Sequence, residues 1–419
     1  MSIINMPVCV WDRINGTAMQ SQRYRDTLIA LLTHRTFQVF FTSLTVGLLL
    51  FLTLRYYFKI IKGNDFETYF LAAQCLLKGQ SPYFRIESFP YLYPLFFAWV
   101  LIPLTALPLL AASMCWYLLN IFFSAYGIYL LIKMLDAKNQ FSLPLQWAAG
   151  CGVFWILLPA IQNDLFNGQV NLLVLLLCIL FYYFYQTGRV GRAILCLSLG
   201  IAIKIYPAIY LLYFFVRKEW KPFLFSLFLT AVFCLLPILT LGVDIFRMYW
   251  DYVFKLPTTF LQDALASRLD VTLYGFFASF FPFIEHSLAL MAITSIALLI
   301  VLAVYDRLNP NAPFAFFSLY LIAILFLQPM SETHHLVLLT PTITFLLTKL
   351  LDRSTAHFSM YAVPLFLFML FYYIAGYDKD GPYYFLAILV LVGFWLFYLR
   401  RHDSFTIKEG TESSTMPLS

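Results

Sequence analysis

The sequence predicts an all-α, polytopic membrane protein, a bundle of about twelve membrane helices, two of them short. Three observations predict this fold class. Hydrophobic residues make up 62% of the 419 residues and charged residues 11%, whereas soluble domains are about one half apolar and one quarter charged. Nearly every long segment is apolar on all sides, which favours lipid as its surroundings. Basic residues gather in short loops between these segments, as the positive-inside rule predicts for cytoplasmic loops.

The chain is expected to have three parts. Residues 1–35 are polar and lack the pattern of a removable signal peptide, so we expect a cytoplasmic N-terminal tail. Residues 36–402 are expected to form the transmembrane domain. Residues 403–419 are rich in Ser, Thr and Glu and are expected to be a disordered cytoplasmic tail. The seven cysteines form no CxxC pair or metal-spaced cluster, so we expect small core residues and no metal site.

The first membrane span is expected at residues 36–58, which follow a basic segment with Arg23, Arg25 and Arg35. Later basic loops mark the same, cytoplasmic face, and each span needs about 20 apolar residues. Working between these marks, we expect further spans near residues 110–132, 144–162, 170–186, 222–241, 286–305, 312–328, 335–351, 358–375 and 382–400.

Residues 193–216 depart from this pattern. Basic residues flank the segment at both ends, yet it is too short for two full crossings, and Pro207 cannot continue a helix. We expect two short helices that form a hairpin entered from the cytoplasmic side. Its tip, Lys204, would lie at membrane depth inside protein.

Residues 91–108 form the second exception. The segment is hydrophobic enough to span, but a span here would invert the sidedness of every later basic loop. Its Tyr, Trp and Pro residues favour a helix lying in the outer interface, with a span as the alternative. With the interfacial helix, four polar segments share the outer face, as an active site at a membrane surface requires. They are Asp65 to Glu87, Asn163 to Asn171, residues 242–285 and residues 331–335.

Residues 63–83 carry the most informative polar group, Asp65. Asn64 or Asp65 can cap a short amphipathic helix that Gly79 ends. Asp65 is therefore either a candidate catalytic base at the membrane surface or only a helix cap. The apolar face of this helix is expected to consist of Phe66, Tyr69, Phe70, Ala73 and Leu77.

Three basic residues, Arg55, Lys59 and Lys62, follow one helical face at the outer end of the first span. Basic residues on the outer side run against the positive-inside rule. They indicate either an anionic ligand, for which a lipid phosphate is the natural candidate, or side chains that reach the lipid headgroups.

The turn NDLFNGQVN, residues 163–171, carries amides, including Gln169 and Asn171, that could bind sugar hydroxyls or form a plain turn. Lys204 is a candidate because a charge at membrane depth costs several kcal/mol and is by default functional. In residues 242–285, basic side chains such as Arg268 stand among aromatic residues, a mixture suited to phosphate and carbohydrate.

The motif SETHH, residues 331–335, places Glu332, His334 and His335 at the outer end of a span. Two adjacent histidines cannot face the same way on a helix, so we expect one of them to point inward. No third ligand is close in sequence, which disfavours a metal site. A hydrogen-bonding or phosphate-contacting histidine is the favoured interpretation, and an interface-anchored one the alternative.

These segments together resemble glycosyltransferase family 87, the polyprenol-phosphate-mannose-dependent mannosyltransferases of the C-type membrane superfold. The similar stretches are DFETYFLAAQCLLKGQSPY, YLYPLFFAWVLIPLTALPLLAA, NGQVNLLVLLL, GIAIKIYPAIYLL with RKEW, and SETHHLVLL, within residues 36–350. The family usually has two prolines after the tyrosine, where this chain has Tyr93, Pro94 and Leu95.

The resemblance implies inverting transfer of a sugar, which is mannose in this family, from a polyprenyl phosphate to a lipid or glycan acceptor on the extracytoplasmic face of a bacterial cell membrane. It makes Asp65 the match for the family's catalytic acidic residue, acting as general base. Lys204, Arg268 and one of His334 or His335 would stabilise the leaving phosphate. Tyr69 joins the substrate-binding candidates. No nucleotide sugar, metal, cofactor or nucleic acid is implied.

Two other classes of protein remain as alternatives. An O-antigen polymerase or ligase also has about a dozen spans, but is expected to use arginines of a large late outer loop. A secondary transporter would have repeated halves with matched broken helices, and only the segment 193–216 fits that pattern.

Overall fold

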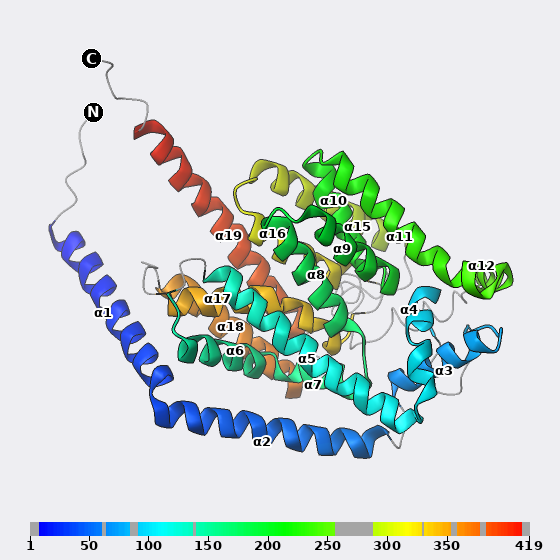
Figure 1. Ribbon diagram of the computed structural model, residues 1–419. Helices are drawn as coiled ribbons and strands as arrows, with labels where there is room; N and C mark the ends of the chain where they lie inside the picture. Colours follow the sequence, from blue (N-terminus) through cyan, green and yellow to red (C-terminus); the bar gives the residue numbers. More distant parts are fainter. Residues whose placement is uncertain are drawn as a thin grey trace.

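The computed structural model describes residues 8–60, 64–83, 91–136, 140–255, 288–328, 331–352, 358–377 and 383–412. Within these ranges every regular element is a helix (Figure 1). The elements are α1 (Val8–Thr33), α2 (Arg35–Ile60), α3 (Asp65–Leu77), α4 (Leu95–Val100), η1 (Ile102–Ala106), α5 (Leu109–Leu135), α6 (Leu143–Ile156), α7 (Leu158–Asn167), α8 (Asn171–Gln186), α9 (Val190–Ile203), η2 (Tyr206–Ala208), α10 (Ile209–Val216), α11 (Trp220–Leu241), α12 (Val243–Lys255), α15 (Leu288–Leu308), α16 (Pro313–Leu327), η4 (Thr333–Leu339), α17 (Thr340–Leu351), α18 (Phe358–Tyr377) and α19 (Tyr383–Glu412).

Six helices of the described ranges are long and apolar enough to cross a membrane: α2, α5, α11, η4 with α17, α18 and α19. The bent pair α6 and α7 adds a broken span, and shorter apolar helices, α8, α9, η2 with α10, and α16, pack among them. The prediction of a polytopic helical membrane protein is therefore confirmed. The short helices α8 and α16 have 16 and 15 residues, less than the about 20 that a full crossing needs.

The expected span 144–162 is not one straight helix. It divides into α6 and α7, which meet at 70°. Pro159 lies in the first turn of α7, and because proline has no amide hydrogen, α6 cannot continue through it. The bend is important for the site, since α7 carries Asp164 and leads into the turn at Gly168.

The segment 91–108 does not cross the membrane as a helix. It forms α4 and η1, of 6 and 5 residues, and six α-helical residues are only about 9 Å long. Prolines interrupt it, with Pro94 before α4, Pro103 in the first turn of η1 and Pro108 before α5. α4 packs on α3 and α11, and Trp99 Nε1 donates to Thr240 Oγ1 at 2.9 Å.

The short helices gather at one end of the molecule. Figure 1 shows α3, α4 and α12 at the end where α2 finishes and α5 begins, while the start of α1 and the end of α19 lie at the opposite end. The polar segments expected on one face therefore include α3 and the start of α12, which lie together in space.

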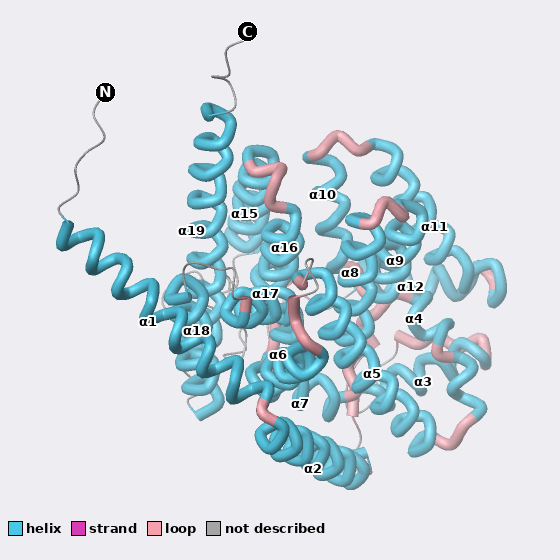
Figure 2. The backbone as a smooth tube through the Cα atoms, turned by 60° about the vertical axis from the view of Figure 1, so that its left-hand side comes forward, coloured by secondary structure: helices cyan, strands magenta, loops and turns pink. Residues whose placement is uncertain are grey.

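The expected break in residues 193–216 falls at Lys204. α9 ends at Ile203, and Lys204 has an extended backbone, with φ −148° and ψ 127°. Figure 2 shows the loop before α9 and the loop after α10 at the same end of the bundle, as expected for a hairpin.

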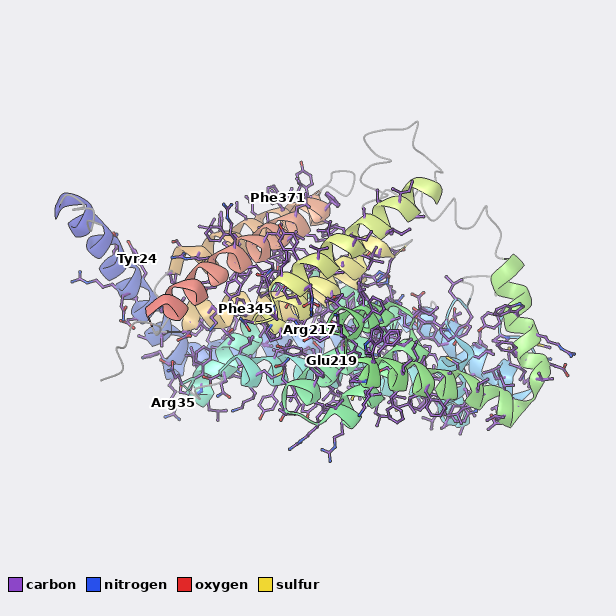
Figure 3. All side chains as sticks on the ribbon, turned by 90° about the horizontal axis from the view of Figure 1, so that it is seen from above. Tyr24, Arg35, Arg217, Glu219, Phe345 and Phe371 are labelled. Carbon is purple, nitrogen blue, oxygen red and sulfur yellow. The ribbon has the colours of Figure 1, made fainter. Side chains whose placement is uncertain are left out.

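Near that end, a buried ion pair ties α10 to α15. Arg217 Nη2 lies 2.7 Å from Asp306 Oδ1, and Tyr320 of α16 donates to Asp306 Oδ2 at 3.1 Å. The guanidinium also stacks over the Tyr213 ring at 4.2 Å. Figure 3 shows Arg217 close to Glu219, which accepts a hydrogen bond from Tyr185.

Both terminal segments contain helix within the residues that the structure describes. Residues Val8–Thr33 form α1, which projects from the bundle with Tyr24 exposed, although Arg25 and Ile29 are buried (Figure 3). At the other end, α19 continues to Glu412, into the segment expected to be disordered. No proline lies between Pro382 and Pro417 to end that helix earlier.

Candidate active site

Asp65 is the first residue of α3, and its neighbour is the helix cap. The side chain of Asn64 accepts a hydrogen bond from the Glu67 amide, while Asn64 Nδ2 donates to Tyr56 Oη at 3.2 Å. The alternative in which Asp65 only caps the helix is therefore wrong. Most of the predicted apolar face is buried, but Leu77 is 55% exposed, because it is the last residue of the helix.

The turn after α7 packs directly against the start of α3. Gly168 has φ +65°, and a Cβ at this position would lie 2.7 Å from Phe66 Cβ. Trp116 Nε1 donates to the Gly168 carbonyl at 2.9 Å. Only glycine allows this backbone to approach so closely, and the approach brings Gln169 beside Asp65.

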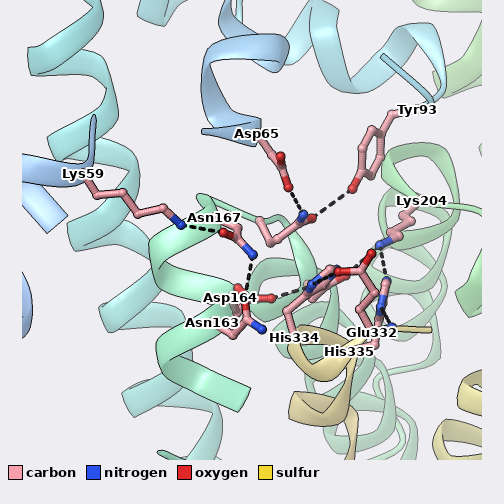
Figure 4. A network of polar contacts seen from close by, with 12 residues as sticks. Lys59, Asp65, Tyr93, Asn163, Asp164, Asn167, Lys204, Glu332, His334 and His335 are labelled. Carbon is pink, nitrogen blue, oxygen red and sulfur yellow. Dashed lines mark hydrogen bonds and ion pairs between the residues drawn. The ribbon is translucent and has the colours of Figure 1, made fainter. Parts of the chain in front are cut away.

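Gln169 connects Asp65 with two tyrosines, Tyr69 and Tyr93, of which Figure 4 shows Tyr93. Its Nε2 donates to Asp65 Oδ2, and its Oε1 lies 3.1 Å from both the Tyr69 and the Tyr93 hydroxyls. The hydroxyls are donors and lie 2.9 Å apart, so they fix the amide with its NH₂ group toward the carboxylate. Among the described residues no hydrogen bond reaches Asp65 Oδ1, which leaves that oxygen available as a base.

The pKa of Asp65 is raised to about 6, chiefly because the carboxyl group is buried and secondly because the Glu332 carboxylate lies nearby. Lys59, the hydrogen bond from Gln169, and Lys204 act in the opposite direction. Lys59 itself donates to Asn167 Oδ1 at 2.7 Å. A carboxyl group with a pKa near neutrality is suited to general-base catalysis, because it is ionised at neutral pH and still basic enough to accept a proton.

A second series of hydrogen bonds runs through Asn171, two residues after Gln169 in the chain. Asn171 Nδ2 donates to Asp164 Oδ2 at 2.9 Å, and Asn171 Oδ1 accepts from Lys204 Nζ at 2.7 Å. Asp164 is completely buried, so its carboxylate orients the amide of Asn171, and that amide in turn holds Lys204. The ammonium also lies over the rings of Tyr93 and Tyr206, at 5.4 and 5.2 Å.

Lys204 Nζ lies 3.2 Å from His335 Nε2. The Glu332 amide donates to His335 Nδ1 at 3.1 Å, and since an amide cannot accept, the neutral imidazole carries its proton on Nε2. Two donors, an ammonium and an N–H group, therefore lie 3.2 Å apart and cannot bond each other. This arrangement favours the binding of an anionic oxygen.

Both histidines of SETHH are buried, each 6% exposed, which corrects the expectation that only one would point inward. The reason is that they lie in the 3₁₀ helix η4, which contacts α7, α8 and α16 and so is covered on several sides. His334 Nδ1 lies 3.6 Å from the partly exposed Glu332 carboxylate.

Most of the predicted site residues come together. Asp65, Tyr69, Gln169, Asn171, Lys204, His334 and His335 line one polar region between α3, α7, α9 and η4 (Figure 4). Arg55 is exposed and stacks over Phe166 at 5.1 Å, at the edge of this region. Lys62 and Arg268 lie outside the described residues.

Two residues of the site were not selected from the sequence. In the sequence, Tyr93 was noted only because the residues after it differ from the family's two prolines. No motif near Tyr93 predicts its hydrogen bond to Gln169. Asp164 lies in the turn NDLFNGQVN, and its complete burial makes it a support for Asn171. Tyr69 is 2% exposed and likewise supports Gln169. In the described ranges no three His, Cys, Asp or Glu residues are grouped as metal ligands.

A network of polar side chains among apolar helices places the candidate site within an integral membrane protein. The model of glycosyltransferase family 87 matches residues 91–341, more than half of the chain. The chain therefore belongs to glycosyltransferase family 87, and its substrates are a sugar donor and an acceptor. The matched range includes Gln169, Lys204 and His335 but begins after Asp65, so the role of Asp65 depends on the geometry above.

Proposed function

We propose that this chain is an inverting glycosyltransferase that moves a sugar, most simply mannose, from a polyprenyl-phosphate carrier to a hydroxyl of a lipid or glycan acceptor. The observation that carries this proposal is the arrangement of one polar region. The partly buried Asp65 carboxylate, with a pKa of about 6, shares it with the donor pair of Lys204 and His335.

The reaction needs one base and one anion-binding group. Asp65 Oδ1 takes the proton of the acceptor hydroxyl while its oxygen forms a bond to the anomeric carbon. The bond from that carbon to the phosphate oxygen breaks on the opposite face, and its electron pair leaves with the lipid phosphate. Lys204 and His335 stabilise the charge on that phosphate, so no acid is required. Glu332, which is partly exposed beside them, is available to sugar hydroxyls.

A lipid-linked donor suits the surroundings of the site. The Lys204 turn lies between the apolar helices α9 and α10, where a water-soluble nucleotide sugar would have to leave solvent. The outer location follows from the basic loops, which the positive-inside rule places in the cytoplasm. Glu87→Cys, in the first outer loop, should react with an impermeant maleimide added outside spheroplasts. Reaction only after permeabilisation would contradict this sidedness.

The central test measures the transfer of labelled mannose from purified polyprenyl-phosphate mannose to the molecules of a total lipid extract. Asp65→Asn keeps the size of the side chain but removes its basicity, so transfer should fall by about 10²- to 10⁴-fold. Glu67→Gln, two residues along α3, is the matched control and should retain activity. Retention of most activity by Asp65→Asn, at unchanged thermal stability, would remove Asp65 as the base. Parallel reactions with polyprenyl-phosphate glucose and arabinose test the sugar.

A further inference from the structure

An apolar groove lies between α2, α5 and α6, and Leu165 of α7 also lines it. Its volume is about 260 Å³. Among the polar side chains that border it, Gln146 Nε2 donates to the Phe141 carbonyl and Trp147 Nε1 donates to Thr42 Oγ1. The groove therefore presents hydrocarbon. Its walls include Leu49 of α2, Ile121 and Ile128 of α5, and Gly150 and Phe154 of α6.

The groove lies at membrane depth. α2 and α5 are both candidate spans, and α6 is the first half of the broken span. α2 is poorly covered by protein, with Leu50, Phe51 and Leu54 between 58% and 67% exposed. Hydrocarbon chains of the bilayer are therefore the molecules that surround the groove, and an apolar chain is the occupant whose chemistry fits its walls.

The two ends of the groove differ. Tyr129 lines the end near the last turn of α5, and the ammonium of Lys133 lies 5.8 Å from the centre of its ring. Toward α3 the space between α2 and α5 is filled by Tyr56 and Tyr117, which are both fully buried and stack at 4.3 Å. A chain thus enters from the end that carries a cation, where an anionic headgroup would be stabilised.

We propose that the groove is a binding site for one hydrocarbon chain of a glycerophospholipid whose phosphate lies at Lys133. The lipid is separate from the sugar donor and belongs to the leaflet that the Lys133 end of α5 faces. Its chain fills the space that protein leaves between α2 and the bundle. It also supports Tyr56, whose hydroxyl accepts the hydrogen bond from Asn64, the residue beside Asp65.

Gly150 offers a test that does not disturb the helix. A Cβ there would meet Ile132 Cδ1 and Ile128 Cγ2 at 3.7 and 3.8 Å, which is ordinary contact. Gly150→Leu therefore fills the groove and raises the helix propensity of α6. Gly47→Leu is the matched control, because Gly47 is exposed on α2 with no atom within 4 Å of its Cβ.

The full-length chain is delipidated in detergent, dioleoyl phosphatidylglycerol is added, and native mass spectrometry counts the retained lipid. The natural chain and Gly47→Leu should retain phosphatidylglycerol and gain about 2 °C or more in Tm, because a ligand of the folded state stabilises it. Gly150→Leu should lose both effects, and Lys133→Gln should retain less lipid. Equal retention and equal Tm gain in Gly150→Leu and Gly47→Leu would overturn the proposal.

Discussion

Replacing Gln169 by leucine tests how the amide controls the base. Leucine fills a similar volume but cannot donate to Asp65 Oδ2. A hydrogen bond to a charged group contributes about 1.5–3 kcal/mol, and 1.36 kcal/mol corresponds to one pH unit of pKa. The apparent pKa of Asp65 should therefore move upward by about one to two pH units from its value of about 6, because the ionised form loses its donor.

The assay is the initial rate of sugar transfer as a function of pH, at saturating donor. A base must be ionised, so the rate of the natural chain should fall as pH decreases through about 6. At pH 6 the ionised fraction in Gln169→Leu should be about five- to fifty-fold lower than in the natural chain. At pH 9 both carboxyls are ionised, and the deficit should shrink.

Gln74→Leu is the matched control, since Gln74 lies on α3 itself and is only partly buried. The transfer rate of Gln74→Leu should fall at the same low pH as that of the natural chain. If the rate of Gln169→Leu is lowered equally at every pH, the substitution has damaged the fold. If the fall in rate at low pH occurs at the same pH in Gln169→Leu and the natural chain, the proposed control of Asp65 by the amide is refuted.

Three further perturbations follow from the geometry. Lys204→Met should lower kcat about 100-fold by removing a donor to the leaving phosphate, and a change confined to donor KM would contradict stabilisation of the transition state. Gly168→Ala should lower thermal stability more than Gly79→Ala. Both residues have positive φ, but only at Gly168 would the added Cβ lie 2.7 Å from another side chain. Equal losses of Tm in the two variants would contradict this clash. Arg217→Ala should lower the free energy of unfolding by about 3 kcal/mol, because it leaves Asp306 buried without its cation. Adding Asp306→Asn to this variant should recover part of the lost stability in denaturant unfolding. No recovery would contradict the ion pair as the cause.

The local features of the site could be predicted from the sequence. Asn64 caps α3 and Gly79 follows its end because amide side chains and glycine satisfy helix termini, whatever the rest of the chain does. The break at Lys204 follows from Pro207 in the same way. The bend between α6 and α7 was missed, although Pro159 gave a signal for it.

Long-range partners could not be predicted. Gln169 lies 104 residues from Asp65, and Lys204 lies 131 residues from His335. Their hydrogen bonds exist because helices far apart in sequence pack together, and periodicity contains no information about which helices become neighbours. For the same reason Arg55, expected to bind an anion, lies over Phe166.

By itself the sequence determined that this protein is a bundle of apolar helices, where α3 begins and ends, and that Asp65, Lys204 and His335 are candidates. These properties depend on hydrophobicity, charge and backbone chemistry, which act locally. Only the tertiary structure decided that Gln169 and Asn171 are the supports that orient Asp65 and Lys204. The physical reason is that an amide can serve as support or as ligand, and its buried neighbours determine which of its two ends faces the substrate.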